Sequence, residues 1–165
     1  MLAALKCALM ASRLLEAGAM EGLLALLEKE DIPAWRATYL GFLATRADDP
    51  RVRQVAQQSL GAADPLERAA AVRVFSGSPD ASARLTPALT DPVRLVRLDA
   101  AWELSPTLPA DSPSRRELEA YLALSLDQPA GRLRLGQDLA NRGQLAAAEV
   151  EVARAGELRA GADVG

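Results

Sequence analysis

The chain has 165 residues, of which 34 are Ala and 28 are Leu while aromatic residues make up 4%, and this composition favours helices and argues against an all-β fold. It has no His and one Cys, which excludes a histidine base, a Ser-His-Asp triad, an internal disulfide and a Cys-rich zinc site, so neither catalysis nor a bound metal or cofactor is expected. The net charge is −3 without a concentrated basic run, which argues against nucleic-acid binding.

The first eleven residues are apolar but are interrupted by Lys6. The stretch has no charged region ahead of it and is too short for a membrane span, so it is a poor match to a signal peptide. We expect an amphipathic first helix in which Cys7 is partly buried. These residues do not indicate a cellular compartment for the protein.

Proline recurs after capping residues and predicts where helices begin. Asp or Ser accepts a hydrogen bond from the first free amides, and Pro suits the first helical position. The breakpoints are Asp31-Ile32-Pro33, Asp48-Asp49-Pro50, Asp64-Pro65, Ser78-Pro79-Asp80, Asp91-Pro92, Ser112-Pro113 and Gln128-Pro129. About ten helices and no strands are therefore expected, two of them before residue 31 and divided near Gly18.

The segments between the prolines carry apolar residues at helical spacing. These stripes include Leu66, Ala70 and Val74; Val93, Val96, Ala100 and Leu104; and Leu118, Leu122 and Leu126. Pro87 is expected to shorten or kink the helix that follows Ser82, and 106–111 is expected to be a loop. The polar helix over 50–60 is expected to face outward.

The spacing of the units predicts a repeat architecture. Asp31 and Asp64 are 33 residues apart, and Asp64 and Asp91 are 27 apart. A period of this size with two helices per unit is typical of an α-solenoid of stacked helix pairs. The predicted fold class is therefore all-α.

Three units share an Asp, a Pro and then an Arg, followed by small and apolar residues. They begin at Asp31, Asp64 and Asp91, and their arginines are Arg36, Arg68 and Arg97. This pattern resembles HEAT-like repeats over 1–128. The resemblance implies that Asp and Arg form polar ladders between layers, which is a structural role.

The segment 129–156 has a different pattern, with Leu135-Gly136, Leu139, Gly143 and Ala148. It resembles one tetratricopeptide repeat, with helices near 129–141 and 144–156. Gly136 would lie where the two helices pack closely, and Gly143 would lie in the tight turn. Residues 157–165 are expected to form a flexible tail on one continuous solenoid.

HEAT-like repeats that run into a tetratricopeptide repeat resemble the C-terminal accessory region of large bacterial multihaem c-type cytochromes. The resemblance implies an exported, periplasmic setting and a multihaem cytochrome as partner. The haem-binding motifs are absent, so the chain would be a scaffold without the electron carrier.

Polar side chains on the helices that would line a concave groove are the candidate partner-binding residues. They are Arg73, Asp99 and Glu103 from the HEAT-like pairs and Arg134, Gln137 and Asn141 from the tetratricopeptide-like pair. Mixed charges and amides suit an extended peptide, although an ordinary solvated face has the same composition. The expected function is a non-catalytic protein–protein interaction scaffold.

Two further interpretations stay open. Some HEAT-like proteins that resemble bilin lyases handle tetrapyrroles, and Trp35, Tyr39 and Trp102 are candidates for a cavity wall, although ordinary core is the simpler interpretation. At the other end of the chain, Val150, Val152 and Leu158 leave an apolar face. Either the last helix is its own cap, or this face meets a partner or a second copy of the chain.

Overall fold

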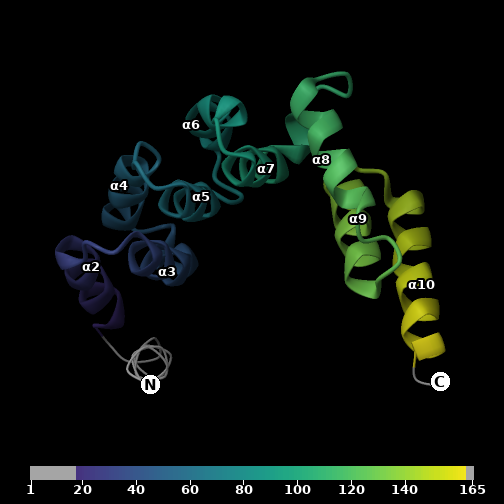
Figure 1. The fold of residues 1–165 in the computed structure, drawn as a ribbon, viewed down its shortest axis with the longest axis horizontal. Coiled ribbons are helices and arrows are strands. Elements are labelled where there is room, and N and C mark those ends of the chain that lie inside the picture. Colours follow the sequence, from purple (N-terminus) through teal and green to yellow (C-terminus); the bar gives the residue numbers. More distant parts are fainter. Residues whose placement is uncertain (1–17, 163–165) are drawn as a thin grey trace. The chain divides into compact units, whose positions relative to one another are not determined.

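The computed structural model describes residues 18–162, and within this range it is all-helical, with nine α-helices, three short 3₁₀-helices and no strand (Figure 1). The chain divides into two compact units, residues 1–80 and 81–165. The first expected helix and Cys7 lie outside the described residues. None of the helices between residues 18 and 162 combines the length and hydropathy that a membrane span requires.

The described part of the first unit, residues 18–80, contains two pairs of helices. These are α2 (Ala19–Lys29), α3 (Pro33–Leu43) with a 3₁₀ turn over Ala44–Arg46, α4 (Pro50–Ser59) and α5 (Pro65–Val74). α3 and α5 pack on each other, while α2 packs on α3 and α4 packs on α5. Leu40, Val52 and Phe75 are completely buried in this unit.

The second unit continues with one short helix and four longer ones. These are α6 (Ala81–Leu85), a 3₁₀ segment over Thr86–Thr90, α7 (Arg94–Glu103), a 3₁₀ turn over Ser105–Thr107, α8 (Pro113–Ala123), α9 (Pro129–Asn141) and α10 (Leu145–Ala162). Ala101, Leu118 and Leu122 form a buried cluster, and Trp102 packs against it. The most extensive helix contact is between α9 and α10.

Most of the helix starts predicted from proline are confirmed. α3, α4, α5, α8 and α9 each begin at their proline, and the side chains of Asp49, Asp64 and Ser112 accept the expected hydrogen bonds from backbone amides. α6 ends at Leu85, two residues before Pro87, and a 3₁₀ segment follows it. This shortening is the one expected, because proline has no amide hydrogen to donate to a helical hydrogen bond.

The starts predicted at Pro79 and Pro92 are each wrong by two residues, since α6 begins at Ala81 and α7 at Arg94. The Asp91 carboxylate accepts from the Val93 amide at 2.8 Å, Val93 is extended, and α7 begins at Arg94. This offset explains why Asp91 and Arg97 are farther apart in the sequence than Asp64 and Arg68. Arg97 therefore takes the same helical position as Arg36 and Arg68.

An arginine is the fourth residue of every helix from α3 to α9. The seven residues are Arg36, Arg53, Arg68, Arg84, Arg97, Arg116 and Arg132. From this position Arg36, Arg68, Arg97 and Arg116 each donate to one or two backbone carbonyls that precede the helix, at 2.7 to 3.1 Å. The recurrence gives the fold a helical-repeat-like character and these arginines a structural role.

The apolar stripes are confirmed with three exceptions. Val93 and Leu126 lie outside the helices, because α7 begins at Arg94 and α8 ends at Ala123. Val96, Ala100 and Leu104 are buried, as are Leu118 and Leu122, but Leu66 is 48% exposed. The first turn of α5 presents Glu67 to the interior instead. Glu67 accepts from Arg36 at 2.9 Å and from the buried Ser59 at 2.8 Å, so this carboxylate takes the place expected for Leu66.

The last two helices agree closely with the expected pair. α9 has the predicted bounds, and α10 starts one residue later than predicted. It differs by continuing to Ala162, which includes part of the segment expected as a tail. Gly143 has φ +75° in the turn, and a Cβ on Gly136 would lie 3.3 Å from the Ala148 carbonyl, so both glycine expectations are confirmed.

Candidate functional site

The structure distributes the six predicted groove residues over three helices. Arg73 lies on α5 in the first unit, whereas Asp99 and Glu103 lie on α7 and the other three lie on α9 in the second unit. Arg73 is exposed, and Asp99 and Glu103 are half-buried. Their role in binding a partner stays a prediction.

The three predicted residues on α9 are exposed and share one side of the helix. Gln137 donates from Nε2 to Oδ1 of Asn141 at 2.8 Å, and Arg134 donates to the Tyr121 hydroxyl at 2.9 Å. These bonds hold the side chains in place on the surface. Gln137 also lines a cavity in the second unit.

That cavity is an open groove of about 630 Å³ between α9 and α10. It is lined by Leu133, Gly136, Gln137 and Ala140 of α9 and by Leu145, Ala148, Glu149, Val152 and Ala153 of α10. Both sets follow helical spacing, so each helix contributes one continuous stripe. We name this feature the α9/α10 groove.

The walls of the α9/α10 groove are apolar and solvent-accessible. Leu133 is 50% exposed, Leu145 62% and Val152 50%. Gly136 and the small side chain of Ala148 allow the two helix backbones to approach closely at the floor. The taller side chains then stand on either side of a shallow depression.

Beside the groove floor, α10 is tied to α9 by charge. Glu151 is buried and accepts from Arg132 at 2.8 Å and from Arg154 at 2.6 Å. The hydrogen bond from Arg132 is the main cause that lowers the pKa of Glu151 below its ordinary value of 4.5. This ionic contact fixes the pairing of α9 and α10, so that the groove has walls with a defined position.

Glu149 is the ionisable residue that lines the α9/α10 groove. Its carboxylate makes no hydrogen bond or ion pair with any other residue that the structure describes. The groove therefore combines an apolar floor with a single negative charge at its wall. Of the three α9 residues predicted from the sequence, Gln137 lines this groove, whereas Glu149 and the leucines were not predicted.

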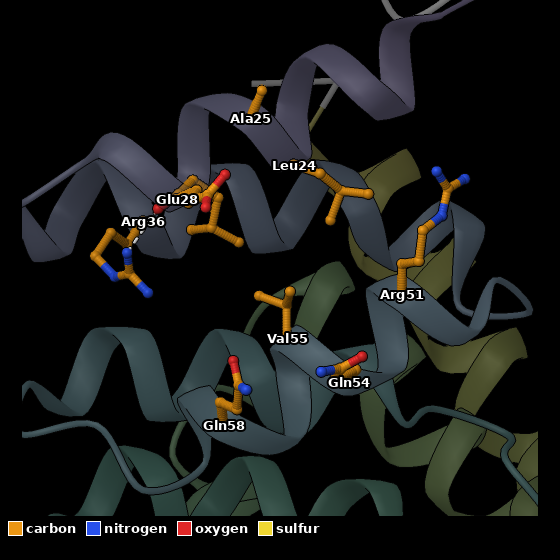
Figure 2. Close-up of a pocket in the computed structure, with 9 residues that line it drawn as sticks. Leu24, Ala25, Glu28, Arg36, Arg51, Gln54, Val55 and Gln58 are labelled. Carbon is orange, nitrogen blue, oxygen red and sulfur yellow. Dashed lines mark hydrogen bonds between the residues drawn. The ribbon is translucent and has the colours of Figure 1, made fainter.

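A second cavity, of about 570 Å³, lies in the first unit between α2, α3 and α4 (Figure 2). Figure 2 shows Gln54, Val55 and Gln58 of α4 opposite Leu24 and Glu28 of α2. The polar face of α4, expected to face outward, thus forms one wall of this cavity. It opens because α2 and α4 pack on α3 and α5 rather than on each other.

The two arginines at this second cavity are already engaged. Arg36 donates to Glu67 and to the carbonyls of Leu27 and Glu30. Arg51 pairs with Asp49 at 2.9 Å and with Glu21 at 3.3 Å, and the bond from Arg51 lowers the pKa of Asp49 to about 2. These contacts make both arginines parts of the helix framework.

The three aromatic residues considered for a tetrapyrrole cavity do not line either of these cavities. Tyr39 is 1% exposed, its ring stacks with that of Trp35 at a centroid distance of 6.2 Å, and its hydroxyl lies 3.3 Å from a Glu30 carboxylate oxygen. Trp102 packs on the core cluster of the second unit. All three residues serve as packing groups.

A buried polar cluster in the second unit was missed by sequence reasoning. Arg115 of α8 donates to both Asp138 carboxylate oxygens, at 3.0 and 3.3 Å, and to the Ser105 carbonyl at 2.5 Å. The Ser105 hydroxyl donates to Asp138, and Arg142 adds a contact to the same carboxylate at 3.1 Å. Arg115, Asp138 and Ser105 are all closed off from solvent, so the cluster joins three elements and offers no access to a substrate.

Between residues 18 and 162, no three His, Cys, Asp or Glu side chains gather as ligands of a metal ion would. Comparison of the chain with protein-family models, with curated proteins and with solved structures gave no match. The α9/α10 groove is thus the candidate site on its own geometry.

Proposed function

We propose that the chain is a non-catalytic protein-interaction scaffold and that the α9/α10 groove binds a helix of a protein partner. The observation that carries this proposal is the open groove with two parallel apolar stripes. A groove of this kind is suited to an amphipathic helix whose apolar residues recur at i, i+3, i+4 and i+7. The finer likeness of the helix pairs to HEAT-like and tetratricopeptide repeats, stacked as a solenoid, belongs to the same proposal.

The energetic support comes from exposed apolar side chains. Complete burial of a Val or Leu side chain contributes about 1.5–3 kcal/mol. Leu133, Leu145 and Val152 are each about half exposed, so each would gain about half of that on contact with a partner helix. Exposed apolar side chains that cluster in one groove, rather than being scattered singly over the surface, are typical of an interaction surface.

The partner class that the sequence resemblance implies is a multihaem cytochrome. A scaffold of this type would present a preformed groove and would need no metal or cofactor for binding. This identity rests on the resemblance, whereas the mode of binding rests on the groove.

The experiment is a selection from a displayed library of 18-residue amphipathic helices with a fixed apolar stripe and randomised flanking positions. Val152→Arg places a charge inside the groove, and Val150→Arg is the matched control, because Val150 lies on the same helix, is 48% exposed and does not line the groove. Circular dichroism verifies that both variants are folded. We expect selected peptides to bind the wild-type chain and Val150→Arg and to lose at least tenfold in affinity for Val152→Arg.

Two results would overturn the proposal. One is a library that yields no peptide above background on the wild-type chain. The other is a set of selected peptides that binds Val152→Arg as tightly as it binds Val150→Arg.

A further inference from the structure

We infer that the helix bound in the α9/α10 groove is cationic, with a Lys or Arg positioned against Glu149. This inference rests on the proposed function and specifies the chemistry of the partner. It follows from the single charge of the groove and from the way that the neighbouring charges are already paired.

Glu149 stands between Leu145 and Val152 on the stripe that α10 contributes to the groove. A helix lying on this stripe covers the carboxylate together with the two apolar side chains. Covering a carboxylate without a partner costs free energy, because the charge loses water and gains nothing in return. A basic residue on the incoming helix removes this cost and adds a charge-assisted hydrogen bond.

The groove itself supplies no cation to Glu149. Its other lining residues are apolar or, in the case of Gln137, an amide whose Nε2 already donates to Asn141. The arginines of α9 and α10 that lie outside the lining are committed or remote: Arg132 and Arg154 bind Glu151, Arg134 binds Tyr121, and Arg159 follows Glu149 by ten residues, about 15 Å along the helix. The positive charge must therefore come with the partner.

The same argument disfavours a second copy of the chain as the occupant. If two α9/α10 grooves paired about a twofold axis, each would bring the same lining residues to the other. Two Glu149 carboxylates would then be covered in one interface, with no basic lining residue from either copy. A cationic helix from a different protein meets no such penalty.

The experiment uses the full chain and three synthetic 18-residue helical peptides with one apolar stripe of Leu and Ile. The peptides differ only at the positions beside the stripe, which carry Lys, Gln or Glu. Fluorescence anisotropy of each labelled peptide measures its affinity for the wild-type chain, for Glu149→Lys and for Glu157→Lys. Glu157 is the matched control, because it is exposed on the same helix and does not line the groove.

We expect the Lys peptide to bind the wild-type chain roughly threefold to tenfold more tightly than the Gln peptide, and the Glu peptide to bind most weakly. Glu149→Lys should reverse this order, whereas Glu157→Lys should keep it. Equal affinity of all three peptides, or an order unchanged by Glu149→Lys, overturns the inference while leaving the proposed function intact.

Two other outcomes separate the inference from its premise. Failure of all three peptides to bind counts against helix binding itself, and so against the proposed function. Sedimentation of the chain alone tests the second copy: a dimer that is lost in Val152→Arg and kept in Val150→Arg would identify another copy as the occupant and overturn the inference.

Discussion

Arg115 and Asp138 form an ion pair that is closed off from solvent, with 3.0 Å between Nη1 of the arginine and Oδ1 of the carboxylate. Arg115 lies on the same face of α8 as Leu118 and Leu122. Because this face packs into the interior, the charged side chain is buried together with the two leucines. A buried pair of this kind depends on both partners, because either charge alone would be left in a medium that solvates it poorly. The pair joins α8 to α9 within the second unit.

Removing one member of this pair should destabilise the second unit strongly. Asp138→Leu leaves the Arg115 guanidinium buried without its carboxylate, and the expected loss is about 3–5 kcal/mol in the free energy of unfolding. Urea unfolding followed by Trp102 fluorescence in a Trp35→Phe background reports on this unit. The double variant Arg115→Met/Asp138→Leu is the control and should lose less than Asp138→Leu alone. A double variant as unstable as the sum of the two single variants would contradict this account.

The helix boundaries could be predicted from the sequence because they depend on local chemistry. Asp49-Pro50, Asp64-Pro65 and Ser112-Pro113 each combine a side chain that caps with a residue that suits the first turn. Where the local signal was ambiguous, as at Asp91-Pro92, the start was misplaced by two residues. Gly136 and Gly143 were also predictable, since a close approach and a positive φ both demand glycine.

The charged interior could not be predicted in the same way. Ser114-Arg115-Arg116 reads as a solvated turn of helix, and only the phase with Leu118 distinguishes the buried arginine from the exposed one. The sequence pattern grouped Arg97 with Arg36 and Arg68, but it did not give their common helical position, because distances counted from proline do not equal distances counted from the first helical residue. The groove leucines were missed because exposure depends on which neighbouring helices are present, and this is a property of the tertiary fold.

Gly131 should tolerate no side chain. A Cβ at this position would lie 1.8 Å from the Ser125 carbonyl oxygen, which is backbone and belongs to the turn before α9. Gly131→Ala is therefore expected to destabilise the second unit by at least about 2 kcal/mol, in the range of strongly overpacked sites. Gly156→Ala on α10 is the control, since a Cβ there meets nothing within 4 Å and should stabilise the helix by up to about 1 kcal/mol. Equal thermal midpoints for the two variants would refute the close contact.

The pair of Arg97 and Glu117 should make stability depend on pH. Arg97 donates to both Glu117 oxygens, at 2.9 and 2.7 Å, and this bond is the main cause that lowers the pKa of Glu117 below its ordinary value of 4.5. A carboxyl whose pKa is lowered by folding contributes stability above its unfolded pKa and loses it as the pH falls through the folded pKa. Glu117→Gln should therefore cost stability at pH 7, and the cost should shrink progressively below pH 4.5.

Urea midpoints of the wild-type chain and Glu117→Gln at pH 7 and pH 3 measure this effect. In an Arg97→Met background the main partner is gone and the half-exposed Arg94 remains at 3.5 Å from the carboxylate, so the cost of Glu117→Gln at pH 7 should be smaller. A cost that is the same at both pH values would show that the ionised pair contributes nothing.

Arg68 should stabilise the first unit through its hydrogen bonds to backbone carbonyls. Its Nη1 donates to the Ala62 and Ala63 carbonyls, each at 2.8 Å, from the fourth position of α5. Arg68→Met removes two charge-assisted bonds and is expected to cost about 1–2 kcal/mol. Arg68→Lys should recover only part of this, because a single ammonium lacks the planar array of donors. Arg46→Met is the control: Arg46 is exposed at the end of the 3₁₀ turn, and its replacement should change the free energy of unfolding, followed by Trp35 fluorescence, by less than about 0.5 kcal/mol. Equal losses for Arg68→Met and Arg46→Met would show that the recurrent arginine position does not hold the helix starts in place.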